Sequence, residues 1–166
     1  NKSSPPQLTT LDTIRWAKDN GFDTVDITLY YVPGYSNTAM PSPAEQEAAL
    51  AYAREIKELC AELNMPISGT GLQNNFADPS EARRKLDVER IKFWIKVAHE
   101  MGAPVIRVFS GTPPVDIGRK GWEVIARDRM VPHLQEICDY ALEYYPDVQI
   151  GLQNHGDMLA TANQVM

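Results

Sequence analysis

The strongest constraint on this chain is a unit of structure that recurs along its length. Each unit has a stretch of helical periodicity, a short turn with glycine or proline, an apolar run and a polar loop. The apolar runs centre near residues 26, 69, 107 and 150, a spacing of about 40 residues, which suits one helix plus one strand. Parallel strands need helix-sized crossovers between them. The repeat therefore predicts an α/β fold with a parallel sheet.

The individual elements follow from caps, breakers and periodicity. We expect strands over 24–28, 67–72, 105–109 and 148–153, and helices over 10–20, 44–63, 80–101 and 121–145 with a break at Pro132. Asp157 is the expected N-cap of a further helix over 158–166. A closed (β/α)8 barrel needs roughly 250 residues. We therefore expect a single domain over 1–166 that is a partial barrel of about four βα units, truncated at both ends.

Composition narrows the classes of partner. The formal net charge is −6, which is a poor match for a phosphate backbone and argues against a nucleic-acid partner. No apolar run approaches the roughly 20 residues of a membrane span. We expect Cys60 and Cys138 to lie on apolar helix faces, and the charged run over 81–90 to be a solvated helix face.

Candidate site residues are the polar side chains at the carboxyl ends of the strands, where parallel α/β folds carry their chemistry. Gln153, Asn154 and His155 end the last strand, and their alternation allows at most one of Gln153 and Asn154 to point straight inward. Gln73, Asn74 and Asn75 end the second visible strand, and their amides suit polyol hydroxyls. His155 either lines the site or makes loop hydrogen bonds.

Two charged residues lie inside predicted strands. A buried Arg107 needs a partner, and two solutions stay open: it grips a substrate oxygen or carboxylate, or it forms an ion pair with Asp26.

The tryptophans Trp16 and Trp94 are more typical of helix packing. Trp122 follows a strand-end loop and is placed to fold over a pocket. In another such loop, Tyr30, Tyr31 and Tyr35 are candidates to stack on a sugar ring.

Three phrases carry a resemblance to a known family. They are NGFDTVDI over 20–27, MGAPVIRVFSG over 101–111 and GLQNHG over 151–156. In order and spacing they resemble the xylose isomerase-like TIM-barrel superfamily, in particular its sugar phosphate isomerases/epimerases. The resemblance covers the whole chain as units two to five of eight.

The resemblance implies a metal-dependent sugar isomerase or epimerase. The family's usual site holds a divalent metal (Mn²⁺, Mg²⁺, Co²⁺ or Zn²⁺) that assists proton abstraction next to a carbonyl. A glutamate of strand five is commonly a ligand, and its position falls on Gln153, so this sequence departs from the pattern there. His155 is then the candidate catalytic residue. The candidate substrate-binding residues are Arg107, Asn74, Gln73, Asn154, Trp122 and Asp26.

Other functions stay open at this point. A lyase or hydratase acting on oxidised sugars would use the same platform, as would a metal-dependent phosphodiesterase. A non-catalytic sugar-binding barrel with a lapsed metal site is the alternative that Gln153 favours. In each carbohydrate case the expected partner is a small sugar or polyol, with a homo-oligomer as an option. The sequence does not assign a compartment.

Overall fold

The computed structural model describes residues 8–112, 121–155, 158–159 and 161. Its elements follow the expected alternation of helix and strand. They are α1 (Thr10–Asp19), β1 (Val25–Thr28), the 3-10 helix η1 (Leu29–Tyr31), α2 (Pro43–Glu62), β2 (Ile67–Gly71), α3 (Glu81–Met101), β3 (Val105–Phe109), α4 (Trp122–Ile125), the π-helix η3 (Ala126–Met130), α5 (Val131–Tyr144) and β4 (Gln149–Gln153).

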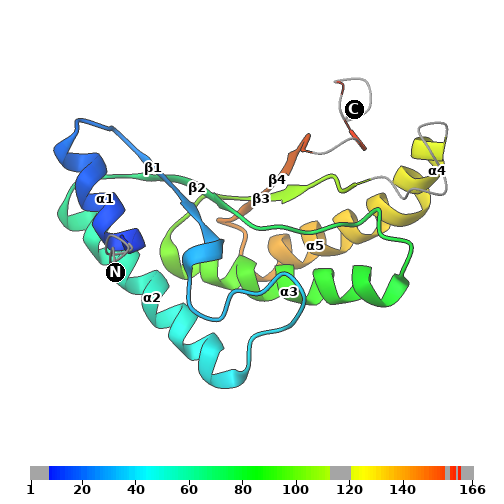
Figure 1. Cartoon of the computed structure of the whole chain (residues 1–166), viewed down its shortest axis with the longest axis horizontal. Helices are drawn as coiled ribbons and strands as arrows, with labels where there is room; N and C mark the ends of the chain where they lie inside the picture. Colours follow the sequence, from blue (N-terminus) through cyan, green and yellow to red (C-terminus); the bar gives the residue numbers. More distant parts are fainter. Residues whose placement is uncertain (1–7, 113–120, 156–157, 160, 162–166) are drawn as a thin grey trace, which may run out of the picture.

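The described strands form one parallel sheet in the order β1-β2-β3-β4. The helices lie along one face of this sheet, and the opposite face carries no helix among the described residues (Figure 1). Strands β1 and β4 are the two edges of the described sheet. The architecture is consistent with a partial (β/α)8 barrel, and the prediction of a parallel α/β fold is confirmed.

Side-chain caps fix where the longer helices begin. Thr9 and Asp12 form a capping box at the start of α1, and Ser42 and Glu45 form one at the start of α2. The hydroxyl of Ser80 accepts a hydrogen bond from the backbone of the first turn of α3. These caps satisfy backbone N–H groups that have no partner within the helix. Helix α1 begins at Thr10, where the sequence predicts a helix start.

The core lies between the helices and the sheet face that they cover. Strand residues with side chains toward the helices, such as Ile27, Ile106 and Val108, are buried. Trp94, Ile95 and other residues of α3 complete this core and are fully buried. Because side chains alternate along a strand, the intervening residues point to the opposite, uncovered face.

The predicted break around Pro132 takes a specific form. Pro132 lies in the first turn of α5, where its missing N–H costs least. The five residues before α5 form the π-helix η3, so the helical region is divided near Pro132 as expected.

The prediction for the two cysteines is wrong in part: Cys138 is exposed on α5, although Cys60 is buried on α2 as predicted. Helical periodicity does not distinguish Cys138 from its neighbour Ile137. Of the two, Ile137 is the residue that packs inward.

The prediction of a solvated charged face over 81–90 is wrong in part. The side chain of Arg90 is 0% exposed, and Arg84 and Asp87 are also buried. Arg90 Nη1 donates to Asp87 Oδ1 at 2.6 Å, which lets a guanidinium enter the core with a charged partner. The exposed members of the run include Glu81 and Lys85, which form an ion pair at 2.6 Å.

The predicted helix over 158–166 and its cap Asp157 lie outside the described residues, apart from Met158, Leu159 and Thr161. Met158 and Leu159 are buried against the core.

Among the described helices, none is both long enough and apolar enough to cross a membrane.

Candidate functional site

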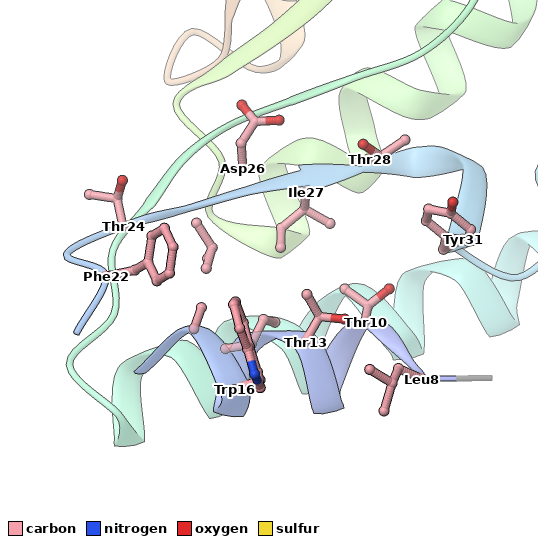
Figure 2. Close-up of a pocket in the computed structure, with 13 residues that line it drawn as sticks. Leu8, Thr10, Thr13, Trp16, Phe22, Thr24, Asp26, Ile27, Thr28 and Tyr31 are labelled. Carbon is pink, nitrogen blue, oxygen red and sulfur yellow. The ribbon is translucent and has the colours of Figure 1, made fainter. Parts of the chain in front are cut away.

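An ion pair on the uncovered face of the sheet forms the floor of the candidate site. Arg107 of β3 donates from Nη2 to Asp26 Oδ1 at 2.7 Å and from Nη1 to Asp26 Oδ2. Figure 2 shows Asp26 pointing away from α1, on the opposite side of β1 from Ile27. The pair is partly exposed, and the Asp26 carboxylate raises the pKa of Arg107 above its usual value. Of the two solutions open for Arg107, the structure contains the ion pair.

Glycines make room for this pair. Gly71 of β2 and Gly151 of β4 are in register with Arg107 on either side. A Cβ atom at Gly71 would lie 3.0 Å from Arg107 Nη2, closer than side chains normally pack. A Cβ atom at Gly69 would lie 3.4 Å from Asp26 Oδ2. Because β2 has no side chain here, the guanidinium of Arg107 crosses it to reach β1.

Two amide side chains follow the carboxyl end of β2. One is exposed, and the other forms hydrogen bonds with backbone groups. Gln73 is exposed, and its Oε1 accepts a hydrogen bond from Asn37 Nδ2 at 2.9 Å. The buried side chain of Asn74 instead bonds both backbone groups of Phe109, with Nδ2 donating at 3.1 Å and Oδ1 accepting at 2.7 Å. Asn74 therefore joins the ends of β2 and β3, whereas Gln73 faces solvent.

Hydrogen bonds to Tyr35 and Asp87 hold the loop that carries Gln73. The backbone N–H of Gln73 donates to Tyr35 Oη at 2.9 Å, and that of Asn75 donates to Asp87 Oδ2 at 2.8 Å. Burial raises the pKa of Tyr35, so its hydroxyl stays protonated at neutral pH. Arg90 lies 5.9 Å from the centre of the Tyr35 ring and holds Asp87 in place. These contacts fix the position of this polar loop at the carboxyl end of β2.

The carboxyl end of β4 brings the predicted Gln153 and His155 beside β3. Gln153 is half-buried and in register with Phe109. The imidazole of His155 stacks on the Phe109 ring, with centroids 4.4 Å apart and planes at 18°. Ser110 Oγ donates to the backbone oxygen of His155 at 3.0 Å and so anchors the turn. Asn154, between Gln153 and His155, is exposed.

We call Gln73, Gln153, Asn154 and His155 the strand-end group. They lie at the same end of the sheet, where the carboxyl ends of its parallel strands meet. Trp122 is half-buried on α4 and packs against the core; the loop before it over 113–120 lies outside the described residues.

Sequence reasoning missed Phe109, which supports His155, and Asn37, which holds Gln73. The strand alternation that places Arg107 on the uncovered face also places Phe109 there, and this signal was available. Asn37 comes from a loop, and nothing in its sequence surroundings indicates its contact with Gln73.

The described residues do not by themselves form a metal site. Among them, no three His, Cys, Asp or Glu side chains gather closely enough to hold an ion. Gln153 offers a neutral amide oxygen, and His155 is stacked on Phe109. The carboxylate of Asp26 is already bound by Arg107. Hard divalent cations bind strongly to groups of carboxylates, so this half of a barrel does not fit such an ion alone.

A parallel sheet whose strands alternate with helices is the architecture of a partial α/β barrel. The sequence matches the family of xylose isomerase-like TIM barrels over residues 14–166. The chain therefore belongs to the xylose isomerase-like TIM barrel family. No curated protein matches the sequence significantly.

Solved structures are similar in fold. A D-tagatose 3-epimerase-like protein is 22% identical with a TM-score of 0.58, and the match covers 87% of this chain and 48% of that one. A xylose isomerase domain protein from Alicyclobacillus acidocaldarius subsp. acidocaldarius is 14% identical with a TM-score of 0.57, covering 89% and 46%. The chain therefore spans about half the length of these structures.

Proposed function

We propose that the chain is part of a sugar isomerase or epimerase, in which the described residues provide the floor and one wall of the sugar site. The supporting observation is the arrangement of the strand-end group above the Asp26–Arg107 pair, in a chain of the xylose isomerase-like family. One of the solved structures with a similar fold is a D-tagatose 3-epimerase-like protein. The substrate class that fits is a small carbohydrate or polyol.

The donors and acceptors on this surface suit sugar hydroxyls. The amides of Gln73, Gln153 and Asn154 each offer both a donor and an acceptor, as a hydroxyl does. Arg107 has five N–H donors, and the bidentate pair with Asp26 uses two of them. The remaining donors are available to a carbonyl or hydroxyl oxygen that lies on the floor.

The chemistry that we propose is redox-neutral movement of a proton. A base removes the proton from the carbon next to a carbonyl, and the proton returns to the other face or the neighbouring carbon. In the described part, His155 is the candidate for this transfer, because its imidazole both donates and accepts protons. Its ring is held by stacking on Phe109, which limits its motion.

The test is exchange of carbon-bound hydrogen with solvent. The whole protein that contains this chain is incubated in D₂O with a panel of ketoses, aldoses and their phosphates, and NMR measures deuterium at the carbon beside the carbonyl together with new isomers. We expect exchange with at least one sugar, and loss of that exchange in His155→Ala. Stereospecific exchange that is unaffected by His155→Ala would remove His155 from the proposal. No exchange with any sugar that binds would contradict an isomerase.

A sugar-binding protein without catalysis is the second candidate. It is favoured by the neutral Gln153 at the position where relatives of this family commonly have a metal-ligating glutamate. Binding of a sugar with no proton exchange in the same experiment is the result that would support it.

Metal dependence is a separate proposal, since ligands beyond Gln153 and His155 would have to come from outside the described residues. Mn²⁺ titration followed by electron paramagnetic resonance compares the wild type with Gln153→Glu. Stoichiometric binding by the wild type would support a metal-dependent protein. Binding only after Gln153→Glu would indicate a lapsed site and favour the sugar-binding candidate.

A further inference from the structure

Arg90 of α3 lies wholly inside the core, where most of its donors find no acceptor. Its side chain is 0% exposed. Nη1 donates to Asp87 Oδ1 at 2.6 Å and makes a long contact of 3.5 Å with the backbone oxygen of Gln73. Among the described residues, its Nε and Nη2 have no hydrogen-bond partner. These two nitrogens carry more than half of the N–H groups of a guanidinium.

Such a side chain is expensive to bury. Burial of a charge and of N–H groups without acceptors is unfavourable, and a buried ion pair often stabilises a fold less than apolar residues of similar volume do. The ring of Tyr35, whose centre lies 5.9 Å from Arg90 Cζ, compensates the charge only in part. Packing alone therefore does not explain an arginine at this position.

The polar contacts of Arg90 and Asp87 converge on the loop after β2. The backbone oxygen of Gln73 contacts Arg90 Nη1, and the backbone N–H of Gln73 donates to Tyr35 Oη at 2.9 Å. Asp87 binds Arg90 with one carboxylate oxygen and accepts the backbone N–H of Asn75 with the other, at 2.8 Å. The peptide groups on both sides of Gln73 are therefore held.

Tyr35 connects this charge to the N–H of Gln73. Its ring packs against Trp94, with centroids 5.4 Å apart, and Trp94 is fully buried as the sequence predicts. Arg90 and Trp94 are four residues apart on α3, about one helical turn. Two core residues of one helix thus fix the Tyr35 ring, and the hydroxyl on this ring accepts from Gln73.

We propose that Arg90 is a positioning residue for the sugar site and that it acts through Gln73. Because both flanking peptide groups are held, the direction in which the Gln73 side chain leaves the backbone is set. Asn37 Nδ2 holds the far end of this side chain by donating to Gln73 Oε1 at 2.9 Å. The inference rests on the proposed function, in which Gln73 contacts a sugar hydroxyl. Groups that are fixed before the ligand arrives lose less entropy on binding.

The test separates a role in the site from a role in the core. Asp87→Leu and Arg90→Met are introduced together in the whole protein that contains this chain, so that neither charge is left unpaired. Urea unfolding gives the midpoint, hydrogen exchange followed by NMR gives the rate at the Gln73 amide, and ligand-observed NMR gives the affinity for the panel of ketoses, aldoses and their phosphates.

We expect a midpoint equal to or above that of the wild type, since apolar residues replace a costly ion pair. Exchange at the Gln73 amide should be faster by about tenfold, and sugar affinity should be weaker by about tenfold, because a fixed hydrogen-bonding group becomes mobile. The matched control is Glu81→Gln with Lys85→Gln, which removes an exposed ion pair of 2.6 Å from the same helix. It should change none of the three measurements.

Tyr35→Phe provides a second variant if the double variant does not fold. It keeps the ring beside Arg90 and removes only the hydroxyl that accepts from Gln73. We expect faster exchange at Gln73 and weaker sugar binding, with a midpoint close to that of the wild type.

A double variant with a clearly lower midpoint, but with the Gln73 exchange rate and sugar affinity of the wild type, would overturn the proposal, since Arg90 would then serve the core alone. An unchanged exchange rate at Gln73 in Tyr35→Phe would overturn it as well. If the wild type binds no sugar of the panel, the proposed function fails separately, and the exchange rate at Gln73 still decides whether Arg90 and Tyr35 position this residue.

Discussion

Arg107 of β3 binds Asp26 of β1 through both terminal nitrogens of its guanidinium, across the intervening strand β2. The contact exists because Gly71 leaves the space above β2 empty. It links residues that are 81 positions apart in the sequence and joins the edge strand β1 to the middle of the sheet. The pair therefore contributes to the fold and forms the floor of the candidate site.

Replacing Arg107 by lysine tests how much this bidentate contact contributes to the free energy of unfolding. Lysine keeps the charge but makes a single point contact. We expect a loss of about 1 kcal/mol in the free energy of unfolding, because both side chains are over a third exposed and water screens the pair. Urea unfolding measures the loss. Arg15→Lys is the control, since Arg15 lies 3.7 Å from Asp12 on the exposed side of α1 and should show no change. Equal stability of Arg107→Lys and wild type would show that the second hydrogen bond of the pair adds no stability.

Gly111→Ala tests how tightly the end of β3 packs on the loop after β2. Gly111 has φ of 100°, and a Cβ atom there would lie 2.5 Å from Asn75 Oδ1. We expect a loss of about 3 kcal/mol, the sum of backbone strain and crowding. Gly21→Ala separates the two effects, because Gly21 has φ of 80° and open space around it. It should lose about 1 kcal/mol from backbone strain alone. Similar losses for both variants would mean that crowding at Asn75 is unimportant.

Asp87→Asn tests the buried ion pair that supports the Gln73 loop. It leaves the guanidinium of Arg90 in the core without a charged partner, and such changes typically cost about 3–5 kcal/mol. Thermal and urea unfolding measure it. Glu81→Gln, which removes the exposed pair with Lys85 on the same helix, should have no measurable effect. A small loss in Asp87→Asn would show that water or another group compensates Arg90.

The capping box at Ser42 predicts a specific dependence of stability on pH. The side-chain and backbone hydrogen bonds from Ser42 lower the pKa of Glu45 below its usual 4.5. The folded state therefore binds this proton more weakly than the unfolded state does. The stabilisation is present above pH 4.5 and is lost as pH falls through the lower folded pKa. We expect Glu45→Gln to be less stable than wild type at about pH 7 and to approach it at about pH 3.

Chemical unfolding at a series of pH values checks this prediction for Glu45. Ser42→Ala should flatten the same pH dependence, since it removes the hydroxyl that bonds the carboxylate. A constant difference between wild type and Glu45→Gln across the range would contradict the assignment.

Much of the fold could be predicted because its signals are local. Helix starts follow from Thr9 and Ser80, the end of α1 from Gly21, and β3 from its β-branched run over 105–109. The strand-end location of Gln73, Gln153 and His155 followed from the same pattern. These features depend on residues that are close in sequence.

What could not be predicted depends on partners distant in the sequence. Whether Arg107 meets a substrate or Asp26 is decided by the absence of side chains on β2. The burial of Arg90 depends on its pairing with Asp87, which a charged run does not reveal. The amide of Asn74 was expected to face a sugar, but backbone groups of Phe109 occupy it.

The most direct test of the central claim asks which end of the sheet binds a sugar. Gln149 and Gln153 lie at opposite ends of β4, and the strand alternation places them on the same face. Ligand-observed NMR with the sugar panel compares Gln149→Ala and Gln153→Ala with wild type. We predict that Gln153→Ala weakens binding by about tenfold, since one well-placed hydrogen bond is lost, and that Gln149→Ala binds as wild type does. Weakened binding in Gln149→Ala with normal binding in Gln153→Ala would contradict a site at the carboxyl ends of the strands.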